Sequence, residues 1–263
     1  MQEQSSQSEA SARQLRTSPP GSVLLIIGMH RSGTSATTGA LQQLGVALGP
    51  KLYRGHAHIN AKGYFEHSDI ADTNEEMLLA MGSSWDDITP RPPSWLHSEI
   101  TAHHRAKLSR FVRRDFSSGQ LWALKDPRIA RLLPMWKELL ASHAFTPAYL
   151  FSVRAPSSVS GSLERRDGFS REKSMLLWLL HYLEAERDSR GQGRVFVDYD
   201  FFLDHPVAEL RRVENNLGIS FPRTPESCEK QLGSFLSKDL RTHTSKGTAT
   251  APGSFEALAT ELY

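Results

Sequence analysis

The segment VLLIIGMHRSGTSATTGAL, residues 23–41, runs from an apolar stretch through a polar loop into a series of small residues. The continuous apolar run at 23–28 is typical of a strand covered on both faces. Residues 34–44 predict a helix that ends at Gly45. A glycine-containing turn between a buried strand and a helix directs backbone N–H groups and the positive helix end at one point. The segment therefore predicts an α/β fold with an anion-binding loop.

The side chains of this loop strengthen the prediction of phosphate binding. Arg31 provides a charged fork, and Ser32, Thr34 and Ser35 provide hydroxyl donors. The loop nearly matches the nucleotide-binding pattern G-x-x-x-x-G-K-[ST], but Thr34 stands where that pattern has lysine. Because nucleoside triphosphatases use that lysine on the β- and γ-phosphates, the loop does not favour a triphosphatase. The alternative is a tight turn that binds no ligand.

Downstream of the loop, short apolar runs alternate with longer amphipathic stretches. This alternation predicts one three-layer α/β domain with a central parallel sheet flanked by helices. Further strands are expected at 121–125, 148–153 and 194–199, and helices at 70–81, 99–116, 129–142, 156–166, 170–190 and 206–217. We expect the domain to span residues 21–236, after a disordered segment at 1–20 and before a partly mobile tail at 237–263.

Composition limits the function. The chain has 263 residues and a formal net charge of +2, too small a charge to indicate nucleic acid as a partner. Cys228 is the only cysteine, which excludes an internal disulfide and a cysteine-based zinc site. No apolar run reaches the roughly 18 residues of a membrane span. These features predict a cytoplasmic protein without a structural metal.

The run Arg31 to Ser35, RSGTS, resembles the 5′-phosphosulfate loop of sulfotransferases that use 3′-phosphoadenosine 5′-phosphosulfate (PAPS). The resemblance implies a nucleotide-kinase-like fold and transfer of a sulfuryl group from PAPS to an acceptor hydroxyl. It also implies that adenosine 3′,5′-bisphosphate (PAP) is released and that no metal is required. In the family the basic residue before Ser-Gly-Thr contacts the phosphosulfate; the matching residue here is Arg31, with Ser32, Gly33, Thr34 and Ser35 completing the loop.

Two later segments extend the resemblance to about residues 22–222. Arg154 follows a predicted strand and Ser162 lies eight residues further on, which resembles the family's 3′-phosphate site. An arginine fork and a hydroxyl on the next helix suit a phosphate. The alternative is an arginine at the sheet edge and a serine bonded to its own helix. The segment VFVDYDFFLDHPVAELRRVENNLGI, residues 195–219, resembles the family's closing strand and helix.

A fourth segment carries Lys125, Asp126 and Pro127, which resemble the Lys-Asp-Pro of tyrosylprotein sulfotransferases and bacterial relatives. The cytosolic branch has Lys-Thr-His here, with the histidine as catalytic base. Pro127 stands at that histidine's place, so the chain departs from the cytosolic branch and is closer to the tyrosylprotein and Golgi branch. The resemblance implies that Lys125 stabilises charge developing on the phosphosulfate.

Because the histidine is absent, another group must remove the acceptor's proton. In the tyrosylprotein branch this group is a glutamate between the first loop and the Lys-Asp-Pro strand. The segment INAKGYFEHSDI, residues 59–70, occupies that interval, and we predict Glu66 as the base. The alternatives, in order, are His67, His58, His56 and Asp126, and Glu66 can also be read as a solvated acid at a helix start.

The acceptor is less well defined by the sequence. The resemblance implies a small molecule or a glycan. Phe169, Trp178 and Tyr182 are candidates to line its pocket, although their neighbours at helical spacing favour an ordinary core helix. Trp85 and Trp95 form an apolar loop, and a late Ser245-Lys246-Gly247 is a candidate to close over the nucleotide. Two other classes remain open: a small-molecule kinase of similar fold, and a non-catalytic nucleotide- or partner-binding module.

Overall fold

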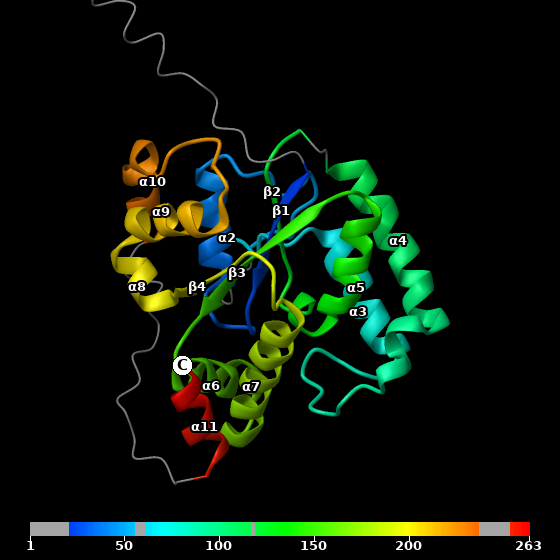
Figure 1. The fold of residues 1–263 in the computed structure, drawn as a ribbon. Helices are drawn as coiled ribbons and strands as arrows, with labels where there is room; N and C mark the ends of the chain where they lie inside the picture. Colours follow the sequence, from blue (N-terminus) through cyan, green and yellow to red (C-terminus); the bar gives the residue numbers. More distant parts are fainter. Residues whose placement is uncertain (1–20, 56–61, 117–118, 237–252) are drawn as a thin grey trace, which may run out of the picture.

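A parallel sheet of four strands in the order β2-β1-β3-β4 forms the centre of the molecule (Figure 1). The structure is a computed structural model that describes residues 21–55, 62–116, 119–236 and 253–263. The strands are β1 (Ser22–Ile27), β2 (Trp122–Lys125), β3 (Thr146–Val153) and β4 (Arg194–Asp198). The three-layer α/β fold predicted from the alternation of strands and helices is confirmed.

The sheet separates two hydrophobic cores, and β1 contributes to both. Val23, Leu25 and Ile27 face one core, whereas Leu24 and Ile26 face the other. All five side chains are at most 1% exposed, because successive side chains of a strand point to opposite faces and both faces here are covered. The uninterrupted apolar run of β1 is the consequence of this double burial.

Helices cover the two faces in separate groups (Figure 1). One core is enclosed by α2 (Thr34–Gln43), α8 (Tyr199–Asp204), α9 (Pro206–Leu217) and α10 (Glu229–Phe235). The other is enclosed by α3 (Ser68–Ala80), α4 (Glu99–Asp115), α5 (Ile129–Ser142), α6 (Pro156–Asp167), α7 (Arg171–Asp188) and α11 (Phe255–Leu262). Two short 3-10 helices lie at Pro93–His97 and Glu226–Cys228.

The sequence predicted the long elements better than the short ones. The bounds of α5 and α9 agree with the predicted helices, and the four strands agree to within two residues. The short helices α8 and α10 were not predicted. In the tail segment, α11 packs against α7, and Arg171 forms an ion pair with Glu256. The expectations for residues 1–20 and for Ser245, Lys246 and Gly247 fall outside the described residues.

The strand order determines where a ligand can bind. The chain leaves β1, adds β2 on one side and then crosses to add β3 on the other side. At such a switch point the loops after neighbouring strands diverge and leave a crevice at the carboxyl edge of the sheet. The loop after β1 and the end of β3 therefore meet where open α/β sheets bind ligands. Within the described residues, no helix has the length and apolar character needed to cross a membrane.

Candidate active site

The loop between β1 and α2 is fixed by its neighbours on both sides. Gly33 has a φ of +87°, and a Cβ there would lie 2.0 Å from a ring carbon of Tyr199, so only glycine fits. The Ser152 hydroxyl, on β3, donates to the Ser32 carbonyl oxygen at 3.0 Å. It also lies 3.2 Å from the Thr37 hydroxyl on α2. These contacts join the loop, α2 and β3 into one unit.

Arg31 connects this loop to the segment that follows β3. The Arg31 Nε donates to the Ser162 hydroxyl at 2.8 Å, across 131 residues of sequence. The Arg154 guanidinium donates to the Arg31 carbonyl oxygen at 3.3 Å and lies 4.9 Å from the ring centre of Tyr199. Arg154 and Ser162 are both buried. The two predicted phosphate motifs therefore form a single cluster.

The charge of this cluster favours an anion. The pKa of Arg31 is lowered, first by burial and then by repulsion from the guanidinium groups of Arg166 and Arg154. An anion bound between these like charges offsets their mutual repulsion, so the cluster is stabilised when an anion binds. Arginine forks and hydroxyls are the donors that phosphate oxygens accept from in proteins. The donor set fits the phosphate groups of a nucleotide.

The second cluster lies at the end of β2. Lys125 Nζ is 2.5 Å from Glu66 Oε1, and both residues are buried, at 3% and 8% exposed. The same ammonium donates to the Tyr64 carbonyl oxygen at 3.1 Å and to the Ser35 hydroxyl at 3.2 Å. Ser35 belongs to the first turn of α2. The predicted base and the predicted charge-stabilising lysine are therefore in direct contact, beside the loop between β1 and α2.

Two of the four alternative bases, His67 and Asp126, are engaged in other contacts. His67 Nε2 is 3.0 Å from Asp115 Oδ2, and burial is the main cause that lowers the pKa of His67. Asp126 is 1% exposed and accepts hydrogen bonds from Asn74 Nδ2 and from the Arg128 backbone and guanidinium nitrogens. A carboxylate so saturated suits a structural role. The other two candidates, His56 and His58, lie outside the described residues.

Two of the three predicted acceptor-pocket residues are part of the core. Trp178 Nε1 donates to the Arg154 carbonyl oxygen at 3.1 Å, and the Tyr182 hydroxyl donates to the Ser152 carbonyl oxygen at 2.6 Å. Both side chains are buried. Their contacts hold the end of β3, and with it Arg154, in place. Phe169 is half-buried, with its ring centre 5.7 Å from that of Trp85 and 3.9 Å from the Lys173 ammonium.

His30 is a residue of the loop between β1 and α2 that the sequence analysis did not single out. Its ring centre lies 4.2 Å from that of Trp85, and its Nε2 is buried with no hydrogen-bond partner in the described part of the chain. The pKa of His30 is lowered well below its usual value by burial and then by the charges of Arg166 and Arg128. Its place beside Arg31 in the loop was the available signal. No group of three His, Cys, Asp or Glu side chains among the described residues is arranged to hold a metal ion.

Comparison with solved structures identifies the fold. No family model matches the sequence, and no curated protein matches it. A sulfotransferase domain from the curacin biosynthetic pathway is 13% identical, with a TM-score of 0.48 over 92% of this chain and 97% of that one. Sulfotransferase STF9 from Mycobacterium avium is 12% identical, with a TM-score of 0.44 over 91% of this chain and 72% of that one.

A third structure is more similar. The sulfotransferase domain of the olefin synthase from Synechococcus PCC 7002 is 16% identical, with a TM-score of 0.52, and the match covers 93% of this chain and 95% of that domain. Nearly the whole of each chain is aligned, so the likeness extends across the sheet and both helical layers. The chain has the fold of a sulfotransferase domain.

Proposed function

We propose that this chain is a PAPS-dependent sulfotransferase that transfers a sulfuryl group to a hydroxyl of a small molecule or glycan in the cytoplasm. One observation carries the proposal: the hydrogen bond from Arg31 to Ser162 joins two motifs that are 131 residues apart. A tight turn without a ligand does not need an arginine that reaches a buried serine on another helix. The Lys125–Glu66 pair beside this cluster adds the groups that a transfer reaction requires.

The arginine cluster would bind the nucleotide. Arg31, with Ser32 and the backbone N–H groups that follow Gly33, is suited to the 5′-phosphosulfate, because the positive end of α2 lies at the same place. Arg154 and Ser162 are suited to the 3′-phosphate. A nucleotide with phosphates at both positions uses all these donors, whereas a nucleoside triphosphate has no 3′-phosphate for Arg154 and Ser162.

The buried pair would carry out the transfer. Glu66 accepts the proton of the acceptor hydroxyl. At the same time the acceptor oxygen bonds to sulfur, and the bond from sulfur to the 5′-phosphate oxygen breaks. Lys125 stabilises the negative charge that develops on the leaving phosphate oxygen. Ser35 links the two groups to the loop, since its hydroxyl accepts from Lys125. In this step Glu66 takes up the proton, and Lys125 stabilises the charge on the leaving group.

Titration calorimetry with PAP on the wild type and Arg154→Ala tests the proposal. We expect the dissociation constant to rise about 10- to 100-fold in the variant, the range for a lost hydrogen bond to a charged group. Arg165→Ala is the matched control, because Arg165 is exposed on the same helix as Ser162. Equal binding by wild type and Arg154→Ala would disprove the 3′-phosphate assignment.

Two further measurements separate the alternatives. Tighter binding of ATP with Mg²⁺ than of PAP, together with phosphoryl transfer, would indicate a kinase. PAP binding without transfer of labelled sulfate from PAPS to any of a panel of sugars and phenols would indicate a non-catalytic module. We expect PAP to bind more tightly than ATP and labelled sulfate to reach at least one acceptor class.

A further inference from the structure

The residue before Glu66 has an unusual backbone conformation. Phe65 has a φ of +57°, in the left-handed region that residues other than glycine seldom adopt. Such a conformation persists only where the surrounding structure holds it. Because Phe65 and Glu66 are consecutive, the contacts that hold Phe65 also determine where the Glu66 carboxylate lies relative to Lys125.

The ring of Phe65 is held between two helices. Its centre lies 5.8 Å from that of Phe235, edge to face at 80°, at the end of α10. Gly39 of α2 leaves the space that both rings occupy. A Cβ on Gly39 would lie 2.2 Å from Phe235 Cζ and 2.8 Å from Phe65 Cζ. The close packing of α2, Phe65 and Phe235 thus depends on the absence of a side chain at position 39.

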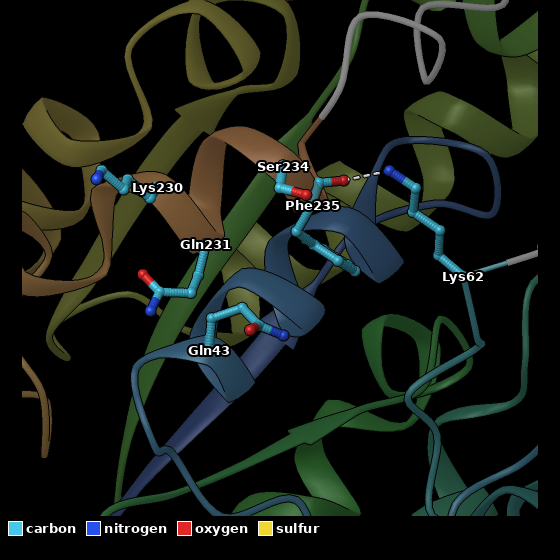
Figure 2. Close-up of a pocket in the computed structure, with 6 residues that line it drawn as sticks. All are labelled: Gln43, Lys62, Lys230, Gln231, Ser234 and Phe235. Atoms are coloured by element: carbon cyan, nitrogen blue, oxygen red, sulfur yellow. Dashed lines mark hydrogen bonds between the residues drawn. The ribbon is translucent and has the colours of Figure 1, made fainter.

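A second contact ties the same segment to α10. The Lys62 ammonium donates to the backbone carbonyl oxygen of Phe235 and lies 5.3 Å from the centre of its ring (Figure 2). Both residues line an open pocket of about 650 Å³, with Gln43, Lys230, Gln231 and Ser234 (Figure 2). Phe235 is only partly buried. Truncation of Phe235 to alanine therefore removes the ring contacts with Phe65 and Lys62 and keeps the backbone carbonyl oxygen that accepts from Lys62.

We propose that Phe235 is a positioning residue for Glu66 and acts through Phe65 and Lys62. The inference rests on the proposed function, in which Glu66 accepts the acceptor's proton. The end of α10 holds residues 62–65, and this holds the carboxylate against Lys125 and near Ser35. Arg31 lies in the loop after β1, Arg154 follows β3 and Ser162 is on α6, so these residues belong to other elements than Phe235 on α10. Loss of the Phe235 ring should therefore impair turnover and leave nucleotide binding intact.

Phe235→Ala tests this separation. With p-nitrophenol as the acceptor probe and PAPS as donor, we expect kcat to fall about 10- to 100-fold, the effect of misplacing a reacting group by about 1 Å. The KM for PAPS and the PAP dissociation constant from calorimetry should change by less than about twofold. Phe235→Tyr, which keeps the ring, should retain wild-type kcat. Gly39→Ala, which crowds both rings, should reproduce the loss.

A double substitution distinguishes positioning from a general structural effect. In a Glu66→Gln background the carboxylate is already gone, so adding Phe235→Ala should lower single-turnover sulfate transfer no further. Leu232→Ala is the matched control, because Leu232 is fully buried on the same helix. It should lower the melting temperature more than Phe235→Ala does and leave kcat unchanged while the protein is folded.

The outcomes separate this inference from the proposed function. Full kcat in Phe235→Ala, with Glu66→Gln inactive, would overturn the inference alone. So would an equal loss of transfer when Phe235→Ala is added to the wild type and to Glu66→Gln, or weaker PAP binding by Phe235→Ala. Full kcat in Glu66→Gln would overturn the assignment of the base, and the positioning role with it. If the wild-type protein does not bind PAP, the nucleotide site itself is disproved.

Discussion

The two halves of the site are built differently. In the proposed nucleotide half, Arg31 lies in the loop after β1 and Arg154 directly follows β3. The Ser152 hydroxyl on β3 donates to the loop backbone and contacts the Thr37 hydroxyl on α2, and Arg154 donates to the Arg31 carbonyl oxygen. In the transfer half, Lys125 ends β2, but Glu66 comes from residues 62–67, which form neither helix nor strand beyond one isolated bridge. The comparison shows that the proposed binding groups are held by the sheet, whereas the proposed base, Glu66, depends on side-chain packing from distant elements.

The largest expected effect separates the halves directly. Glu66→Gln keeps the size of the side chain and an oxygen that accepts from Lys125, but the amide cannot take a proton. We expect kcat for sulfate transfer to fall about 10²- to 10⁴-fold, the usual contribution of a general base, with an unchanged PAP dissociation constant. Glu75→Gln is the control, since Glu75 pairs with Arg128 outside the Lys125 contact. Full activity in Glu66→Gln would place the base elsewhere.

The buried pair of the transfer half should also affect stability. Lys125→Met leaves the Glu66 carboxylate buried without its cation, so the free energy of unfolding should fall by about 3–5 kcal/mol. Adding Glu66→Leu removes the unpaired charge and should recover most of that loss. Urea denaturation measures both variants. Lys51→Met, at an exposed pair with Asp69, should change the unfolding free energy by less than about 1 kcal/mol.

The opposite result would redefine this half of the site. If Lys125→Met is no less stable than the wild type, the carboxylate is solvated and the pair adds nothing to the fold. If the double variant stays as unstable as Lys125→Met, the loss comes from Lys125's contacts with Ser35 and Tyr64 instead of the unpaired charge.

The same contrast explains what the sequence could predict. The β1 run, the loop after it and the strand-terminal positions of Lys125 and Arg154 are local patterns, because strand and helix periodicity show where a parallel sheet ends. That Arg31 contacts Ser162 depends on the strand order, which the alternation alone does not give. The resemblance to a known family supplied the expectation that the two motifs act together.

The parts that the sequence did not predict depend on long-range packing. The left-handed Phe65 has no signature of its own, since no glycine or asparagine marks the position. Trp178 and Tyr182 were candidates for an acceptor pocket, but their polar atoms donate to the carbonyl oxygens of β3 residues or their neighbours. Helical spacing shows which residues share a face, and it does not show which backbone groups that face will meet.

A smaller effect concerns the stability of the folded protein as the pH falls. His181, on α7, is fully buried, and burial lowers its pKa to about 3. The unfolded chain, with a histidine pKa of about 6.5, binds a proton that the folded protein does not. The free energy of unfolding is therefore at its full value above pH 6.5 and falls below it, by about 2 kcal/mol between pH 7 and pH 5 from this residue.

His67, in the transfer half, should contribute in the same direction, because its pKa is also lowered, mainly by burial. Thermal melting at pH 7, 6 and 5 measures the dependence. His181→Leu should flatten it, since leucine takes no proton, whereas His103→Gln, at an exposed position on α4, should leave it unchanged. A melting temperature that does not fall from pH 7 to pH 5 would show that these imidazoles reach solvent.

The smallest effect tests the link within the nucleotide half. Ser162→Ala removes the hydroxyl that accepts from Arg31 Nε at 2.8 Å, while Arg154 and the loop backbone remain. We expect the PAP dissociation constant to rise about 5- to 20-fold, equivalent to about 1–2 kcal/mol, with kcat at saturating PAPS unchanged. Ser160→Ala controls for helix packing, because Ser160 is buried on a different face of α6. A fall in kcat instead would mean that the nucleotide half also orients the transferred group, so that the two halves act together in the reaction.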